Sequence, residues 1–395
     1  MIFQRLRARM NSTKRVIQAL LAEAEITVNG PNPWDITVHN ENFYGRIAAE
    51  SELGLGESYM DSEWDCSQLD QFFYRLFSAN IENKALSNPL FWRAALKQSL
   101  YEIFRKLLNH QTKAKSFIVG RKHYDIGNDL YEAMLDKRLV YTCAFWMDDD
   151  DLDAAQERKL HVACRKLDLQ PGMILLDVGC GWGSLAQYAA QNFGVSVVGM
   201  TVSKAQLALA QARCKGLPVE IRLQDYRELL NSSQRFDRIA SLGMFEHVGI
   251  KNYPIYMRSI AHSLKEDGIF LLHTIGTNTL KKVSSRWIDT YIFPNGEIPS
   301  ITSIAKASER IFVMEDWANY GVHYDKTLMA WHHNFNQHWD ELKTKYNERF
   351  RRMWNYYLLS SAGSFRARQT QLWQVVFSKN GLTQGYPHSV ASFKK

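Results

Sequence analysis

The sequence has no stretch that approaches the ~18 consecutive apolar residues of a membrane-spanning helix. Its basic start, residues 1–15, lacks the apolar core of a signal peptide. The five cysteines are odd in number and scattered, which argues against a disulfide framework and indicates a reducing compartment. No internal repeat or low-complexity tract is present. We therefore expect a cytoplasmic protein whose contacts with membranes, where it makes any, are at the surface.

The composition is that of a folded protein with a basic surface. Of the 395 residues 46% are hydrophobic, and 11 are tryptophans, which suits large apolar or amphipathic surfaces. The net charge of +7 favours an anionic partner, such as a phospholipid surface or a nucleic acid. A chain of this length is expected to form two domains, each with its own core.

The first part of the chain is predicted to be mainly helical. Apolar residues recur at helical spacing in 12–26, with Ser12 or Thr13 as the expected N-cap, and again in 68–81 and 91–108. Residues 26–40 predict two short strands around a Gly/Pro turn. We expect a small, mainly helical domain over 1–110, a linker over 111–128 and a second domain over 129–395.

The predicted helix over 91–108 is amphipathic. Its apolar side includes Trp92 and Leu96. Its other side is basic, with Arg93, Lys97, Arg105 and Lys106. Such a helix can lie on anionic lipid, but a core-facing helix with a solvated basic side is the more common arrangement, and we expect the latter.

The pattern changes in the second half. Short apolar runs alternate with helix-like segments, which predicts an α/β fold with a parallel sheet covered by helices on both faces. The runs are 173–185, 195–203, 219–225, 236–244 and 268–276. A last apolar run over 371–379 is expected to add an edge strand, antiparallel to the rest.

The strongest local signal is LLDVGCGWG over residues 175–183. An apolar strand reaches Asp177, glycines follow at alternate positions, and a helix is expected to open at Ser184. Glycines here let the backbone turn sharply and approach a ligand. A dinucleotide site of the G-x-G-x-x-G type would need its third glycine at position 184, so that motif fits poorly.

The acid-G-x-G-x-G form instead resembles the first motif of class I, Rossmann-like methyltransferases, which bind S-adenosylmethionine. The resemblance implies that the cofactor contacts Asp177, Gly179, Cys180, Gly181, Trp182 and Gly183. The second strand lacks the acid that commonly holds the ribose, so Thr201 and Gln206 are its weaker substitutes. At the end of the third strand, Gln224, Asp225 and Tyr226 are the expected neighbours of the adenine.

Candidate acceptor-side residues follow the next two strands. Glu246 and His247 come after the fourth predicted strand, and His273 ends the fifth. Each residue alone is commonly structural. Together, at the carboxyl edge and beside a cofactor loop, they indicate a site.

Motifs spread over the chain carry a more specific resemblance. They are GLGESYMDSEWDC, HYDIGNDLY, YTCAFW, LDVGCGWG, GMFEHVG, HTIG, YIFPNG and SFRAR with QLWQVVFS. In this order they resemble the cyclopropane-fatty-acid-phospholipid synthases, from about residue 20 onward and including the helical N-terminal domain. The related mycolic acid cyclopropane synthases share the catalytic half and lack that domain.

The resemblance implies the reaction. The sulfonium methyl group adds to a cis double bond of an unsaturated phospholipid, a carbocation forms, a proton leaves the new methyl group, and a cyclopropane ring closes. This chemistry requires that water be excluded. It also requires aromatic faces that stabilise positive charge and a base at the reacting carbon.

The family's base is a bound bicarbonate ion. The resemblance places it between the side chains of Cys143, Glu246, His273 and Tyr324 and the N–H of Ile275. It also implies that Tyr141 faces the sulfonium and the cation, while Tyr124 and Thr142 close over the cofactor. It further implies a homodimer, peripheral on the inner face of an anionic membrane through residues 1–110, with no nucleic-acid partner.

Two other functions stay open. One is a C- or N-methyltransferase that uses the same cofactor without ring closure, and the other is an inactive lipid-binding protein. The cluster His332, His333 and His338 could suggest a metal site. It lacks the H-E-x-x-H spacing, so we expect a plain helix near the lipid-binding region and no metal.

Overall fold

A computed structural model describes residues 2–86, 88–107, 111, 127–148, 150–279 and 285–387. The chain forms two compact units. The first comprises Met1–Asn109, Lys282–Pro294 and Leu328–Gln369, and the second His110–Lys281, Asn295–Thr327 and Thr370–Lys395. The first unit therefore includes two segments that come long after residue 110 in the sequence.

The second unit is built on a seven-stranded sheet in the order β5-β4-β3-β6-β7-β9-β8. The strands are β3 (Ile174–Val178), β4 (Ser196–Thr201), β5 (Val219–Leu223), β6 (Phe236–Leu242), β7 (Leu264–Gly276), β8 (Val313–Asn319) and β9 (Gln371–Ser378). The strands from β3 to β7 are parallel, whereas β9 runs antiparallel to both β7 and β8. The predicted α/β fold and its five parallel strands are confirmed.

The predicted edge position of 371–379 is wrong. β9 lies between β7 and β8, and the edge strand is β8, which the sequence analysis did not predict. All residues of β9 are buried, as a central strand requires, while β8 is partly exposed along its whole length. β8 contains polar residues such as Glu315 and Asp316, so its sequence has no apolar run that would predict a strand.

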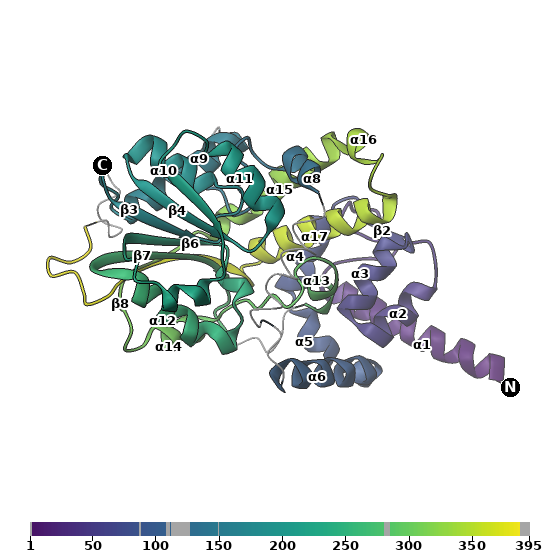
Figure 1. The fold of residues 1–395 in the computed structure, drawn as a ribbon. Helices are drawn as coiled ribbons and strands as arrows, with labels where there is room; N and C mark the ends of the chain where they lie inside the picture. The colour runs from purple at the N-terminus through teal and green to yellow at the C-terminus, as the bar shows by residue number, and fades with distance from the viewer. Residues whose placement is uncertain are drawn as a thin grey trace. The chain divides into compact units, whose positions relative to one another are not determined.

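Helices cover both faces of the sheet. They are α8 (Asn128–Met134), α9 (Leu152–Lys166), α10 (Ser184–Phe193), α11 (Lys204–Arg213), α12 (Tyr253–Ser263) and α14 (Ile301–Ser308), with short 3₁₀ turns η2 (Tyr226–Asn231), η3 (Phe245–His247) and η4 (Ile250–Asn252). In Figure 1, α9, α10 and α11 lie on one side of the sheet, and α12 and α14 lie on the other.

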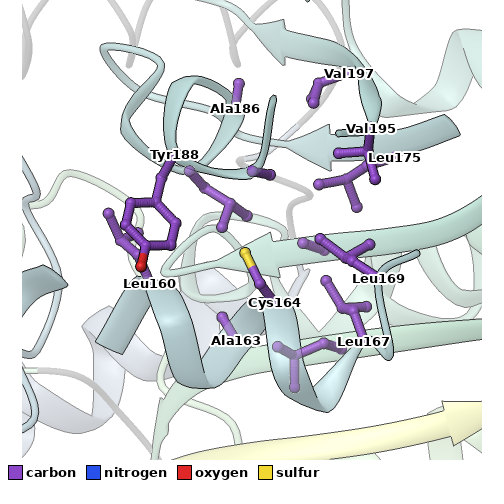
Figure 2. Close-up of a cluster of buried hydrophobic side chains, with 14 of the residues drawn as sticks. Leu160, Ala163, Cys164, Leu167, Leu169, Leu175, Ala186, Tyr188, Val195 and Val197 are labelled. Carbon is purple, nitrogen blue, oxygen red and sulfur yellow. The ribbon is translucent and has the colours of Figure 1, made fainter. Parts of the chain in front are cut away.

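The two-residue period of the strands builds both cores. Leu175 faces the cluster with α9 and α10, and the next residue, Leu176, faces the cluster with α12. Figure 2 shows the first cluster, in which Leu160 and Cys164 of α9 lie with Leu175 and Val197 of the strands. Because the central strands are buried on both faces, they read as continuous apolar runs.

The first unit is mainly helical, as predicted. Its elements are α1 (Ile2–Glu23), β1 (Thr37–Val38), α2 (Asn42–Glu50), α3 (Glu52–Met60), β2 (Trp64–Asp65), α4 (Leu69–Ser78), α5 (Ile81–Leu86), η1 (Pro89–Phe91), α6 (Trp92–Leu107), α13 (Arg286–Tyr291), α16 (Trp339–Leu342) and α17 (Glu348–Arg366). α15 (Gly321–Gln337) begins in the second unit and ends in the first. Arg352 and Arg366 of α17 bind Asp65 and Asp70 at 2.7 and 2.6 Å, which ties α17 to the N-terminal helices.

Two predicted boundaries in this unit are wrong. The first helix begins at Ile2, so Ser12 and Thr13 lie inside it and do not cap it. Only one of the two strands expected in 26–40 forms a ladder: β1 pairs with β2, while Val28 and Ile36 of that segment make only an isolated bridge. There the Asp35 carboxylate accepts the N–H groups of Thr27 and Asn32, which fixes a loop.

The helix predicted over 91–108 forms as α6, but its apolar side does not face the core as expected. Trp92, Leu96, Leu100 and Ile103 of α6 are 78%, 57%, 57% and 53% exposed. Their spacing places them in one stripe along the helix. Phe91 and Ala94 are the neighbouring residues that are buried. None of the described helices is long and apolar enough to cross a membrane.

Candidate active site

The glycine loop follows β3 and owes its shape to positive φ angles. Gly179, Gly181 and Gly183 have φ values of 85°, 54° and 82°, a region that other residues rarely adopt. The N–H groups of Gly179 and Cys180 donate to the Met200 carbonyl of β4 at 3.0 and 2.9 Å. A Cβ on Gly179 would lie 2.8 Å from the side chain of Met244. The loop is therefore held against the neighbouring strand end in a form that tolerates no side chain at its first glycine.

Aromatic residues from two distant motifs pack beside this loop. The indole N–H of Trp182 donates to Asn128 at 3.3 Å, at the start of α8. The Trp182 ring lies 4.8 Å from Tyr131, which in turn lies 5.1 Å from Tyr141. The HYDIGNDLY and YTCAFW motifs thus meet the glycine loop through their rings. Tyr124, expected to close over the cofactor, lies outside the described residues.

Asp177 is a buried acid one residue before the end of β3. Its side chain is almost fully buried, and within the described residues one carboxylate oxygen has no hydrogen-bond partner. Burial raises the pKa of Asp177 to about 7, and the nearby Lys159 opposes this shift. Burial thus disfavours the charged form, and a positively charged partner would favour the ionised carboxylate.

The residues expected near ribose and adenine lie at the next strand ends. Thr201 donates to Gln206 at 2.8 Å, so these two side chains hold each other. The Gln224 N–H donates to the Thr201 carbonyl at 3.0 Å. Asp225 accepts both the N–H and the guanidinium of Arg227 at 3.0 Å, and the Tyr226 ring packs 5.1 Å from Tyr256.

The middle of the YTCAFW segment, Cys143 to Phe145, is buried, and polar contacts hold it. Cys143 is fully buried, and the Thr327 hydroxyl lies 3.9 Å from its sulfur. The same hydroxyl accepts the Ala144 N–H at 3.0 Å. Burial raises the pKa of the Cys143 thiol, so it stays neutral and cannot act as a thiolate nucleophile at ordinary pH. A neutral, buried thiol can line a pocket without adding a charge to it.

Glu246 and Ile275 are brought into direct contact. Glu246 lies in η3, just after β6, and its Oε1 accepts the Ile275 N–H at 2.6 Å. This N–H, expected to bind the anion, therefore orients Glu246. Oε2 is buried without a partner among the described residues. Burial raises the pKa of Glu246 to about 7.

His273 lies on β7, two residues before Ile275, and is also buried. Gln374, opposite it on β9, lies 3.3 Å from Nδ1, while Nε2 has no partner in the described part of the chain. Burial, together with Lys159 and Lys166, holds the pKa of His273 well below its usual value, so the ring is neutral. With Gln374 donating to Nδ1, the Nε2 atom carries the proton and is a hydrogen-bond donor.

Phe145 links these groups to α15. Its ring lies 6.3 Å from His273 and 4.1 Å from Tyr320, in the turn that precedes α15. Tyr324, in the first turn of α15, is buried. His247, beside Glu246, has its pKa lowered by burial to about 4.

Sequence reasoning missed four residues that hold the site: Gln156, Lys159, Thr327 and Gln374. The available signal was a polar residue inside an apolar face, as with Gln374 in QLWQVVFS and with Gln156 and Lys159 on one side of α9.

The three histidines of the cluster lie on or next to helices α15 and α16. His332 and His333 lie on α15, and His338 precedes α16 and contacts the Asn334 carbonyl at 2.9 Å. Among the described residues, no three His, Cys, Asp or Glu side chains gather as metal ligands.

The protein is a class I S-adenosylmethionine-dependent methyltransferase. Three features define this class: the strand order, the antiparallel strand β9 next to the edge strand, and a glycine loop that follows an acidic residue of β3. The residues fit this cofactor, because the loop has open space at Gly181 and Asp177 presents an oxygen without a hydrogen-bond partner among the described residues.

A family model described as mycolic acid cyclopropane synthetase matches residues 111–375, and the chain belongs to this family. The chain is 51% identical over 371 residues to the cyclopropane-fatty-acyl-phospholipid synthase of Escherichia coli K12. This alignment covers 93% of this chain and 94% of that protein. The cyclopropane synthase MmaA2 from Mycobacterium tuberculosis has a TM-score of 0.63 and 31% identity, and covers 67% of this chain and 98% of its own. The mycolic acid cyclopropane synthase CmaA1, solved with SAH and CTAB, has a TM-score of 0.62 and 32% identity over the same shares.

We predict that Gly179→Ala weakens S-adenosylmethionine binding at least about tenfold while the fold is retained. The new Cβ would meet Met244 at 2.8 Å, and the positive φ costs a non-glycine residue about 1–2 kcal/mol. Equilibrium dialysis with labelled cofactor measures the affinity, and far-UV circular dichroism measures the fold. Gly172→Ala is the matched control, because Gly172 has the same φ of 85° with open space around it. Equal affinity in the two variants would contradict a role for the shape of the loop.

Proposed function

We propose that this protein transfers a methylene group from S-adenosylmethionine to the cis double bond of unsaturated phospholipid acyl chains, forming a cyclopropane ring. One observation carries the proposal. Beside a methyltransferase glycine loop, Glu246 Oε2 and His273 Nε2 are a buried acceptor and a buried donor without partners among the described residues. The 51% identity to the E. coli synthase supports the same reaction.

The proposed reaction requires a site from which water is excluded, and the buried residues of this chain provide one. A carbocation next to water would be hydrated before the ring closed. Cys143, Phe145 and His273 are each almost fully buried. The aromatic faces of Tyr141 and Phe145 are the groups proposed to stabilise positive charge, since a ring face attracts a cation.

We assign cofactor binding to the glycine loop with Asp177 and Trp182, to Thr201 and Gln206, to Gln224, Asp225 and Tyr226, and to Tyr124, Tyr141 and Thr142. When bound, S-adenosylmethionine supplies an electrophilic methyl group on a positively charged sulfur. Asp177 offers the opposite charge at the end of β3. The neighbour solved with SAH supports this assignment.

Bicarbonate is the proposed partner of Glu246 and His273. When bound, it would supply the base that takes the methyl proton. Glu246 Oε2 would accept the hydrogen bond of its hydroxyl, His273 Nε2 would donate to it, and Cys143 and Tyr324 would complete the pocket. The orphaned acceptor and donor fit such a group, since a bicarbonate ion both donates and accepts hydrogen bonds.

We further propose that the protein works from the cytoplasmic side as a peripheral, homodimeric membrane enzyme, with the helical N-terminal residues docking on anionic lipid. The exposed apolar stripe of α6 supports this. Apolar side chains of an amphipathic helix insert at the boundary of headgroups and acyl chains, and a basic protein is drawn to anionic lipid. The net charge of +7 has the required sign.

The reaction is tested by mixing the full-length protein, labelled S-adenosylmethionine, bicarbonate and vesicles of unsaturated phospholipid. We expect acyl chains that gain one CH₂ and lose the double bond, identified by mass spectrometry of the fatty acids. A methyl branch or label in an amine would overturn ring closure. No transfer from a folded, cofactor-binding protein would overturn the proposed function.

We predict that Glu246→Gln lowers turnover at least about 100-fold with cofactor affinity nearly unchanged, because the Ile275 N–H takes the single amide oxygen and the NH₂ group then presents donors where Oε2 presented an acceptor. Because burial places the pKa of Glu246 at about 7, wild-type turnover should fall as the pH drops through 7 and this carboxylate takes a proton. The exposed Glu266, at the other end of β7, gives the control Glu266→Gln. Wild-type turnover in Glu246→Gln would remove Glu246 from the mechanism.

We predict that replacing Leu96 and Leu100 by glutamine weakens binding to anionic vesicles at least about tenfold, since inserting a leucine gains about 1.5–3 kcal/mol. Vesicle sedimentation measures the binding. Activity on detergent-dispersed phospholipid should be retained. Ile301→Gln is the control, because Ile301 is an exposed apolar residue outside α6. Unchanged vesicle binding in the α6 variant would exclude this stripe as the docking surface.

A further inference from the structure

Two helices from distant parts of the sequence hold the YTCAFW segment, and α9 supplies the first set of contacts. The Gln156 amide donates to the Thr142 carbonyl at 2.8 Å, and the Lys159 ammonium donates to the Thr142 hydroxyl at 2.8 Å. Further along, the Phe145 N–H donates to the Ala155 carbonyl at 3.0 Å. These contacts fix the course of the backbone before and after the cysteine of the motif.

The start of α15 supplies the second set of contacts, which centre on Thr327. Its hydroxyl accepts the Ala144 N–H at 3.0 Å and the indole N–H of Trp146 at 2.9 Å. It donates to the His323 carbonyl at 2.8 Å. One donated and two accepted hydrogen bonds use the full capacity of a hydroxyl group. The Nδ1 atom of His323 accepts the backbone N–H of Trp146 at 3.1 Å, so both residues bind the same stretch.

The same part of the chain holds the ring of Phe145. Tyr320, the residue before α15, stacks on Phe145 with ring centroids 4.1 Å apart and ring planes 14° apart. The Phe145 ring lies 5.7 Å from the His323 ring and 6.3 Å from the His273 ring. A ring in close stacking cannot turn without losing that contact, so Tyr320 fixes the orientation of Phe145 relative to His273.

These contacts come from one face of the helix. The Tyr320 carbonyl accepts the His323 N–H at 3.0 Å, so Tyr320 opens the first turn. Helical spacing places four residues within an arc of roughly 100°: Tyr320, His323, Tyr324 and Thr327. Tyr324 is one of the proposed neighbours of bicarbonate. The face that holds the YTCAFW segment thus also carries a residue of the proposed pocket.

The acceptor pocket of the proposed function comprises Cys143, Phe145, Glu246, His273 and Tyr324. We propose that Thr327 and Tyr320 are positioning residues of this pocket: they hold Phe145 where its ring stabilises the carbocation and shields it from water. This inference rests on the proposed function, in which a carbocation forms beside Phe145. It assigns Thr327 and Tyr320 no contact with the reacting atoms.

Thr327 acts through the two residues that flank Phe145. Ala144 and Trp146 both donate to its oxygen, so the chain between them is fixed at each end. The Cys143 thiol donates to the Ala144 carbonyl at 3.2 Å, so the thiol follows the same peptide. Without the hydroxyl, both N–H groups lose their acceptor, and a buried N–H group without one is costly. The segment then shifts toward other acceptors, and Phe145 moves with it.

Such a shift changes the fate of the carbocation. With Phe145 in place, a proton leaves the new methyl group and the ring closes. When water enters, its oxygen bonds to the cation and one proton is released to the solvent, which gives a methylated alcohol. Loss of a proton from a neighbouring chain carbon gives a methyl-branched alkene instead. The ratio of these products reports on the pocket and does not depend on the fraction of enzyme that is folded.

The test compares Thr327→Val, which nearly keeps the shape and removes the hydroxyl, with Thr327→Ser, which keeps the hydroxyl. Full-length protein acts on vesicles of unsaturated phospholipid with labelled S-adenosylmethionine and bicarbonate, and the acyl products are separated by gas chromatography and identified by mass spectrometry. In Thr327→Val, turnover should fall at least about tenfold, and the alcohol and branched alkene should rise relative to the cyclopropane. Cofactor affinity should be nearly unchanged, because α9 still holds Thr142. Thr327→Ser should restore the wild-type product ratio.

Ser259→Ala is the matched control. Ser259 is fully buried on α12 and donates to the Ile255 carbonyl four residues earlier at 2.8 Å, as Thr327 does to His323. Its loss removes the same kind of helical hydrogen bond and leaves the YTCAFW segment intact, so turnover and product ratio should stay at the wild-type level. Tyr320→Leu and Tyr320→Phe form a second pair, in which only the leucine variant should raise the share of alcohol and alkene, because phenylalanine keeps the stacked ring.

The product ratio decides the outcome. A wild-type ratio in Thr327→Val or in Tyr320→Leu overturns the role of that residue, and a changed ratio that Thr327→Ser does not restore overturns the role of the hydroxyl. If Thr327→Val does not fold, the two Tyr320 variants decide the inference. A folded wild type that binds the cofactor and forms no cyclopropane overturns the proposed function instead, whatever the variants do.

Discussion

Desolvation of polar groups at the carboxyl edge of the sheet is the constraint on which the site depends. Asp177 lies one residue before the end of β3, Glu246 follows β6, and His273 lies opposite the last residue of β6. Burial is the largest cause of each pKa shift. The two acids are pushed toward protonation and the imidazole toward neutrality. The Ile275 N–H and the Gln374 amide offset part of this cost for Glu246 and His273, since a buried polar group without a hydrogen bond is costly. The burial that excludes water from the site is therefore the same property that makes Ile275 and Gln374 necessary.

The topology supplies those neighbours. Because β9 lies between β7 and β8, Gln374 stands directly opposite His273 in the ladder. A strand at the sheet edge would leave this side chain without the buried surroundings that keep the imidazole neutral. Likewise, the end of β6 brings Gly243, Met244 and Glu246 between the glycine loop and β7. The site is thus a consequence of strand order as much as of its individual residues.

Much of this could be predicted from the sequence where local patterns decide. The glycine loop needs particular φ angles, so its residues identify it, and buried parallel strands read as apolar runs. The positions of β8 and β9, the exposed stripe of α6 and the role of Lys159 could not be read in this way. An apolar stripe looks the same whether it faces a core or solvent, and a lysine on a helix shows no sign of burial until its neighbours are known. Thr142, which accepts a hydrogen bond from the Lys159 ammonium, lies 17 residues before Lys159 in the sequence.

Exposure and burial of apolar groups serve opposite purposes in one chain. The pocket residues must exclude water, while the four apolar side chains of α6 face it. Exposed in the described part of the chain, such a stripe favours association with another apolar phase, and in the proposed function that phase is the bilayer that contains the substrate. A stripe of four side chains gains enough free energy for reversible attachment but far less than a spanning helix.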